Sequence, residues 1–159
     1  MNRTYIVHSI ILLTFCLSAC VHNNTESLMN IDINGLDFKS SQLLVNNKVV
    51  KGSEVPMDST LEFRLYGLHG FKIINYKAFI GTSMFIEDSS GKVLFHHEDI
   101  FSKYDSLGTD TSLINRQLGI YLEIAPPMKK GACYIWHIKI WDMKKENNYI
   151  QSAIKIKTI

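Results

Sequence analysis

Apolar and polar residues alternate with a period of two along most of the chain beyond residue 30. The alternation is clearest in five segments that turn-forming residues separate: 61–65, 79–87, 117–124, 131–142 and 149–159. Successive side chains of a β-strand point to opposite faces, so each segment is predicted to be a strand with one buried face. Apolar residues nowhere recur at helical spacing for more than about two turns, so no long helix is expected.

Segment 131–142 is predicted to be the strongest strand, because its two faces differ most clearly. One face carries Tyr134, Trp136, Ile138 and Ile140, and the other carries Cys133, Ile135, His137, Lys139 and Trp141. Segment 61–65 follows the same rule, with Leu61, Phe63 and Leu65 facing a core and the charged residues between them facing water.

Polar turns predict where the strands end. Residues 88–92 predict a hairpin that joins strand 79–87 to residues 93–95, and residues 144–148 predict a turn before the last strand. Pro126 and Pro127 end strand 117–124, because neither proline can donate a ladder hydrogen bond. Several half-buried strands joined in this way predict an all-β fold, an antiparallel β-sandwich of about seven strands over residues 31–159.

Residues 126–142 add a family resemblance to this prediction. Two prolines precede a glycine turn at Gly131, and Tyr134 follows shortly afterwards in a strand that ends at Asp142. This arrangement resembles the penultimate strand of immunoglobulin-like modules, in which a tyrosine ties the corner of the sheet. The resemblance implies an immunoglobulin-like sandwich.

The first nineteen residues have the layout of a secretion signal. Arg3 supplies one positive charge, and residues 6–15 form a mostly apolar run interrupted by His8, Ser9 and Thr14. That run is too short and too polar to span a bilayer of about 30 Å. We therefore expect residues 1–19 to be removed as a signal peptide.

The motif Leu17-Ser18-Ala19-Cys20 that closes this segment resembles the lipobox of bacterial lipoprotein precursors. The resemblance implies that the Cys20 thiol receives a diacylglycerol group, that cleavage then makes Cys20 the first residue, and that an acyl chain such as palmitate is added to its amine. Two or three acyl chains give stable membrane anchoring. The alternative is an ordinary cleaved signal in which Cys20 is incidental.

Residues 20–30 are polar and without a sustained period, which predicts a flexible tether between the lipid and the domain. Val21 stands where some lineages place the aspartate that retains lipoproteins in the inner membrane. The resemblance therefore implies a lipid-anchored protein of the outer membrane, facing the periplasm or the cell surface.

Charge and cysteine content restrict the possible partners. The chain has 17 Lys and Arg residues against 15 Asp and Glu residues, a balance that argues against nucleic-acid binding because no basic face is dense enough to replace phosphate counterions. Cys133 is the single thiol left after cleavage and acylation, so no internal disulfide is expected. Its place before an apolar strand predicts a buried, inert thiol, and pairing between chains is the alternative.

Candidate metal ligands are few. His96, His97, Glu98 and Asp99 are the densest group, but an extended chain sends alternate side chains to opposite faces, so no metal site is predicted. We expect Asp99 to cap the short turn at residues 100–104. The carboxylates of residues 105–110 surround a glycine but lack the ligand pattern of a calcium loop, so a plain loop is expected and no cofactor is implied.

A binding function is the main hypothesis, because the chain has neither a Gly-x-Ser-x-Gly elbow nor a cysteine-protease signature. The candidate binding residues are His96, His97, Asp99, Asp105 and Trp141. Trp141 either forms an exposed platform with His137 and Lys139, suited to a sugar ring or a protein, or lies under a loop in a second small core.

The hypothesis is thus a non-enzymatic envelope lipoprotein that contacts another envelope protein or a glycan. Two alternatives stay open at this point. One is a structural tether in a secretion or uptake complex, in which a sheet edge recruits a strand. The other is a small hydrolase that uses residues 96–110.

Overall fold

The computed structural model describes residues 28–159. The predicted signal peptide, Cys20 and the predicted tether as far as residue 27 lie outside the described residues. The first strand, β1 (Met29–Asn34), begins two residues before the predicted start of the domain. Within residues 28–159, no helix is long and apolar enough to cross a membrane.

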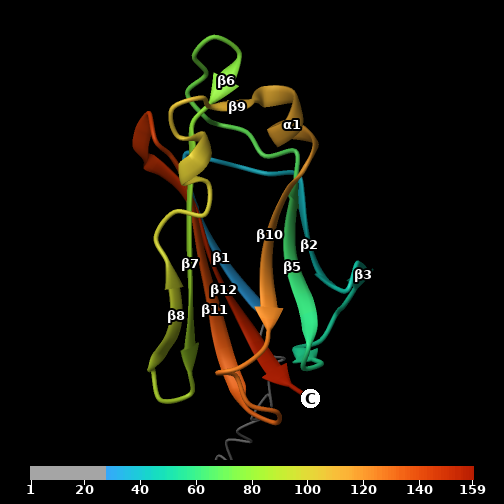
Figure 1. Cartoon of the computed structure of the whole chain (residues 1–159). Helices are drawn as coiled ribbons and strands as arrows, with labels where there is room; N and C mark the ends of the chain where they lie inside the picture. The colour runs from blue at the N-terminus through green and yellow to red at the C-terminus, as the bar shows by residue number, and fades with distance from the viewer. Residues whose placement is uncertain (1–27) are drawn as a thin grey trace, which may run out of the picture.

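Two antiparallel sheets pack face to face (Figure 1). The large sheet runs in the order β1, β12 (Lys145–Thr158), β11 (Cys133–Asp142), β7 (Ile80–Asp88), β8 (Val93–His97), with β4 (Glu54–Val55) paired in parallel to the end of β12. The small sheet runs in the order β10 (Leu118–Ile124), β5 (Ser59–Tyr66), β2 (Ser40–Val45), β3 (Lys48–Val49).

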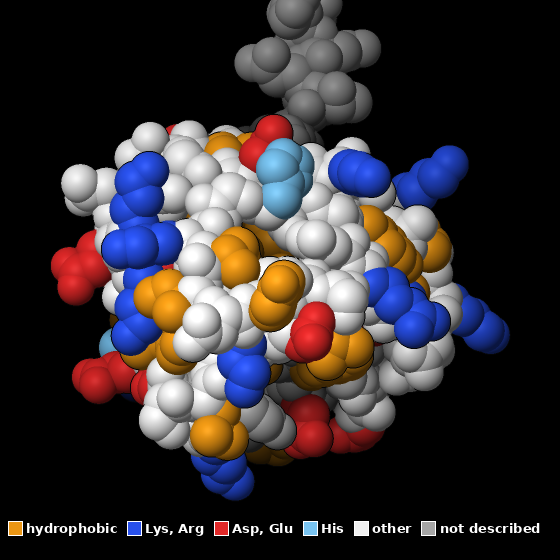
Figure 2. Space-filling view, turned by 90° about the horizontal axis from the view of Figure 1, so that it is seen from above, with side chains coloured by type: hydrophobic (Ala, Val, Ile, Leu, Met, Phe, Trp, Pro, Cys, Tyr) orange, Lys and Arg blue, Asp and Glu red, His pale blue; other side chains and the backbone are white. Residues whose placement is uncertain are grey.

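Short elements gather at one end of the sandwich, which we call the loop end (Figure 1). There β6 (Lys77–Ala78) pairs with β9 (Thr109–Asp110), next to the helix α1 (Thr111–Arg116), and a 3-10 turn (Ser102–Tyr104) follows β8. Asp110 caps α1, because its carboxylate accepts a hydrogen bond of 2.8 Å from the backbone N–H of Ser112. Seen from above, this end mixes hydrophobic side chains with charged side chains of both signs (Figure 2).

The strand order confirms the immunoglobulin-like sandwich. In chain order, β2, β5 and β10 take the places of strands A, B and E, and β7, β8, β11 and β12 take those of C, C′, F and G. Among the described strands none takes the place of D, and β1 adds an edge strand beside β12. The Tyr134 hydroxyl accepts a hydrogen bond of 2.7 Å from the backbone N–H of Lys129, so this tyrosine does tie the corner before β11.

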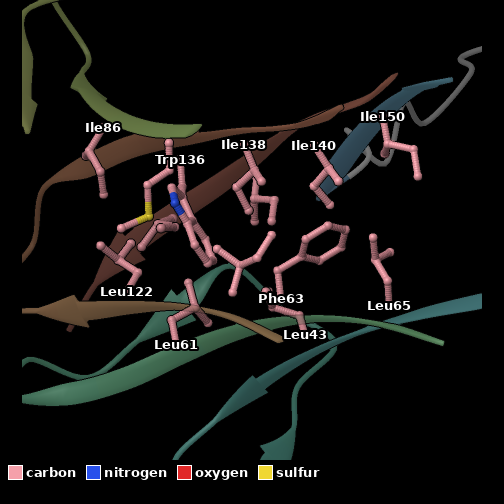
Figure 3. Close-up of a cluster of buried hydrophobic side chains, with 14 of the residues drawn as sticks. Leu43, Leu61, Phe63, Leu65, Ile86, Leu122, Trp136, Ile138, Ile140 and Ile150 are labelled. Carbon is pink, nitrogen blue, oxygen red and sulfur yellow. The ribbon is translucent and has the colours of Figure 1, made fainter. Parts of the chain in front are cut away.

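The core lies between the two sheets (Figure 3). Trp136, Ile138 and Ile140 of β11 point from the large sheet toward Leu61, Phe63 and Leu65 of β5. Trp136 and Phe63 are fully buried and are among the largest side chains in the core. The alternation in the sequence therefore separated the two faces of both central strands correctly, and on β5 it also identified the inward face.

Two local predictions are wrong. Glu62 does not face water: it is 3% exposed, because neighbouring side chains cover it on the outside of the small sheet. Residues 145–148 are not a turn but the start of β12, since the chain reverses at Met143 and Lys144 and Asp142 pairs with Lys145. Asn148 fits this strand because its side-chain amide donates to the carbonyls of Gly35 and Gly70, at 3.3 and 3.1 Å.

Candidate functional site

The solvent-facing side of the large sheet, which we call the outer face, carries the candidate site. Cross-strand pairing aligns its outward side chains in rows. The middle row crosses five strands and contains Asn30, Ala153, His137, Phe85 and His96. The next row toward the loop end contains Asp32, Gln151, Lys139 and Ser83, and the row after it contains Asn34, Tyr149, Trp141 and Gly81.

A half-open hollow of about 430 Å³ lies over the first two of these rows. Ala153 and Ser83 line it with short side chains, whereas Phe85, His137 and Lys139 are long, so the surface is recessed between them. Its volume falls in the range of about 300–1,000 Å³ that small-molecule sites occupy. The hollow is therefore large enough to take part of a ligand that lies along the sheet.

His137 lies at the centre of the middle row and is fixed by its neighbours. Its ring stacks on Phe85, with centroids 4.2 Å apart and an interplanar angle of 8°, and His96 meets the same phenyl ring edge-on at 6.1 Å. The His137 Nε2 atom lies 3.1 Å from Glu87 Oε1. That distance allows an ion pair when the ring is protonated, but the alignment is too poor for a hydrogen bond, and Nε2 has no other partner.

Trp141 forms one end of the site. Its indole lies against Gly81 of β7, directly opposite in the pairing, where a Cβ atom would come within 2.1 Å of the ring. Lys139 Nζ lies 5.9 Å from the Trp141 ring and 5.7 Å from the Tyr149 ring, which is cation–π distance from both. The Tyr149 hydroxyl donates to Asp32 Oδ2 at 3.2 Å, and that bond raises the pKa of Tyr149 above its usual value.

Two of the five predicted binding residues lie on this outer face. His96 lines the hollow. Trp141 lies beside it, in contact with Lys139, which is one of the lining residues. Trp141 is half-buried against Gly81 and lies outside the hydrophobic core, so only part of its ring is available as a platform. His96 and Trp141 are not adjacent. The row of His96 crosses β11 at His137, and Trp141 lies four residues farther along that strand, a distance of about 13 Å.

The other three predicted residues do not join them. His97 points to the opposite side of β8, where its ring lies 6.5 Å from Phe95. Asp99 has a local structural role, because Oδ1 accepts from the backbone N–H of Phe101 at 2.9 Å and so begins the turn as expected. Asp105 is half-buried in the loop beyond it, with Oδ1 lacking a hydrogen bond, and it does not line the hollow.

Residues 28–159 contain no group of three or more His, Cys, Asp or Glu side chains placed to hold a metal ion. The expectation for Cys133 is wrong in one respect, because this thiol is exposed rather than buried. Cys133 is the first residue of β11, where it pairs with Lys157, and its side chain lies on the outer face of the large sheet.

A second polar cluster, on the outside of the small sheet, was not predicted from the sequence. Glu62 binds Arg64 through two hydrogen bonds of 2.6 and 2.5 Å, from Nε and Nη2 to the two carboxylate oxygens. Arg64 also donates to the Tyr66 hydroxyl at 3.3 Å, and these partners raise the pKa of Arg64. Tyr121 lies opposite Glu62 on β10, and burial together with this carboxylate raises the pKa of Tyr121. The cluster is mostly satisfied internally, so we assign it to stability rather than to binding.

No protein-family model matches this chain, and no curated protein matches its sequence. The fold is similar to that in the crystal structure of the C-terminal domain of wzt, with a TM-score of 0.55 and 8% sequence identity, over 82% of this chain and 78% of that chain. At this level of identity the likeness concerns the fold alone, and it agrees with an all-β sandwich.

Proposed function

We propose that this chain is a membrane-tethered, non-catalytic binding module of the bacterial envelope, with its ligand on the outer face of the large sheet. The observation that carries the proposal is the half-open hollow beside Lys139, flanked by the rings of Trp141 and Tyr149. Aromatic side chains with a polar end are enriched where proteins bind partners, because they supply contact area with little loss of conformational freedom.

The tether follows from the lipobox resemblance. Eight residues separate Cys20 from Met29, and eight extended residues span at most about 28 Å. Acyl chains at Cys20 would therefore keep the domain close to the outer membrane. A ligand on the outer face would then be another component of the envelope or a molecule at its surface.

The binding role is favoured over a hydrolase by the placement of the candidate residues. His96 and His97 point to opposite sides of β8. The carboxylate of Asp99 accepts a hydrogen bond from the backbone N–H of Phe101. A general base must itself lie within hydrogen-bond reach of the proton that it removes, and the groups that assist it must face the same site. The hydrolase alternative therefore lacks a geometric argument, whereas the binding proposal has one.

A second candidate function, recruitment of a partner strand in an envelope complex, is favoured by one observation. β8 is an edge strand of the large sheet, and its side chains Val93 and Phe95 are 49% and 43% exposed. An exposed edge strand can pair with a strand of another protein.

Photocrosslinking in intact cells tests the main proposal and separates the two candidates. A photocrosslinking amino acid replaces Gln151 in the hollow, Thr60 on the outside of the small sheet, or Val93 on the edge. We expect an adduct from the position of Gln151 that the additional change Trp141→Ala abolishes, and none from Thr60. An adduct from Val93 alone would favour strand recruitment, and equal adducts from Gln151 and Thr60 would refute a specific outer-face site.

A further inference from the structure

Building on the proposed function, we infer that the outer face binds an acidic oligosaccharide, with a sugar ring against Trp141 and the carboxylate of that sugar at Lys139. The outer face offers three things that such a ligand requires. These are a fixed aromatic surface, a cation without a carboxylate partner, and polar groups that both donate and accept hydrogen bonds.

The aromatic surface is fixed by its contact with the strand beneath it. One side of the Trp141 ring rests on Gly81, and the residue remains partly exposed to solvent. Tyr149 is paired directly with Trp141 on the neighbouring strand, and Lys139 Nζ lies 5.9 Å from the Trp141 ring and 5.7 Å from the Tyr149 ring. The C–H groups on one face of a sugar ring are apolar and pack on such rings, while the sugar hydroxyls at its edge reach polar side chains.

The charges on this part of the face leave Lys139 available. Asp32 also lines the hollow and keeps its charge while it accepts a hydrogen bond from the Tyr149 hydroxyl, but it lies two strands away from Lys139. Glu87 lies at ion-pair distance from His137. Among the described residues, no carboxylate lies within ion-pair distance of Lys139, whose contacts are the two aromatic rings. A ligand carboxylate at this ammonium group would gain a charge-assisted hydrogen bond that no protein group supplies.

The remaining lining favours a sugar over a protein surface. Asn30 and Gln151 present side-chain amides beside the hollow, and Ser83 presents a hydroxyl. Amides and hydroxyls both donate and accept hydrogen bonds, as sugar hydroxyls do. A protein–protein site would instead need a fully buried centre, whereas this hollow is half-open and its apolar lining is interrupted by these polar groups.

Binding assays on the full mature lipoprotein in detergent test the inference. The immobilised probes are oligosaccharides of galacturonic, glucuronic and mannuronic acid, with maltohexaose as the neutral sugar and polyglutamate as the polyanion without sugar. We expect at least one acidic oligosaccharide to bind at least about tenfold more tightly than both controls. Failure of every acidic oligosaccharide would overturn the inference, as would equal binding of polyglutamate or of maltohexaose.

Four variants locate the site. Trp141→Ala and Lys139→Gln are each expected to weaken binding by about tenfold or more. The matched controls are Tyr76→Ala at the loop end and Lys48→Gln on β3, which should change affinity by less than about twofold. An unchanged affinity in Lys139→Gln would overturn the inference, and thermal melting of each variant checks that the fold is intact.

If no oligosaccharide binds but the Gln151 crosslink still depends on Trp141, the proposed function stands and the acidic-sugar inference fails.

Discussion

The indole of Trp141 occupies the space in which a side chain at position 81 would lie: a Cβ atom on Gly81 would come within 2.1 Å of indole Cε2. The two residues face each other across β11 and β7. Glycine normally weakens a strand because it has no side chain to pack. Here the neighbouring ring provides that packing, so the orientation of Trp141 depends on the absence of a Cβ.

Gly81→Ala should therefore move the indole and weaken ligand binding on the outer face. We expect a loss of stability of about 1–3 kcal/mol, the usual cost of forcing extra atoms into a packed site. Urea unfolding of the two proteins measures this difference. Gly52→Ala is the matched control, because a Cβ added there would meet no atom within 4 Å beyond its chain neighbours, and stability should stay the same or rise by up to about 1 kcal/mol.

Removing the charge of Glu62 should destabilise the fold, although the residue lies on the outside of a sheet. Glu62→Gln leaves the guanidinium of Arg64 without its carboxylate partner, and we expect a cost of about 1–3 kcal/mol, below the full penalty of a buried pair because Arg64 is partly exposed. Chemical denaturation provides the measurement. In the exposed pair of Lys157 and Glu54, Glu54→Gln should cost less than about 1 kcal/mol, and equal costs for the two variants would contradict the assignment of Glu62 to stability.

The corner hydrogen bond of Tyr134 predicts a measurable contribution to stability. Tyr134→Phe removes the acceptor of the Lys129 N–H while leaving the ring in place, so the expected loss is about 1 kcal/mol. Thermal melting compares it with Tyr76→Phe, whose side chain is 85% exposed and should be neutral. An unchanged melting temperature for Tyr134→Phe would mean that water replaces the lost hydrogen bond without a loss of stability.

The exposure of Cys133 predicts that its thiol reacts in the folded protein. Titration of the native mature lipoprotein with a thiol reagent should modify one cysteine per chain, and Cys133→Ser should modify none. Two reactive thiols in the native protein would indicate that Cys20 is not acylated. A thiol that reacts only after unfolding would contradict the exposed position.

The lipid anchor is tested by Cys20→Ser, together with mass spectrometry of the mature protein. We expect the protein to carry two or three acyl chains at its first residue and to sediment with outer membranes. Cys20→Ser should be absent from the outer-membrane fraction, because its precursor can be neither acylated nor cleaved at this position. An unmodified Cys20 thiol, or unchanged sedimentation of the variant, would refute the tether.

The period-two alternation was sufficient to predict the sandwich and its core, because a strand with one buried face needs an apolar residue at every second position. It identified Phe63 as an inward residue and placed Trp136 and Trp141 on opposite faces of one strand. It did not identify β1 and β2, whose patterns are less regular, or the six-residue α1, which is too short for a helical period.

The candidate site was harder to predict because it depends on which strands pair and in which register. The sequence placed Trp141 on the face opposite Trp136, but its partners Gly81 and Tyr149 lie 60 residues before it and 8 residues after it. Sequence proximity also misled, since His96 and His97 are adjacent in the chain and point to opposite sides of β8. Glu62 was misassigned for a related reason, because alternation cannot reveal that Arg64 and Tyr121 cover it.

The direction of β1 has a consequence for how the domain would stand on a membrane. β1 begins toward the end at which β12 finishes, and its last residue pairs with Tyr149 near the loop end (Figure 1). A lipid attached a few residues before β1 would tether the domain by the end opposite α1. When the strands stand perpendicular to the membrane, the rows of the outer face run parallel to its plane, and a long polymer aligned with a row then lies across several anchored copies.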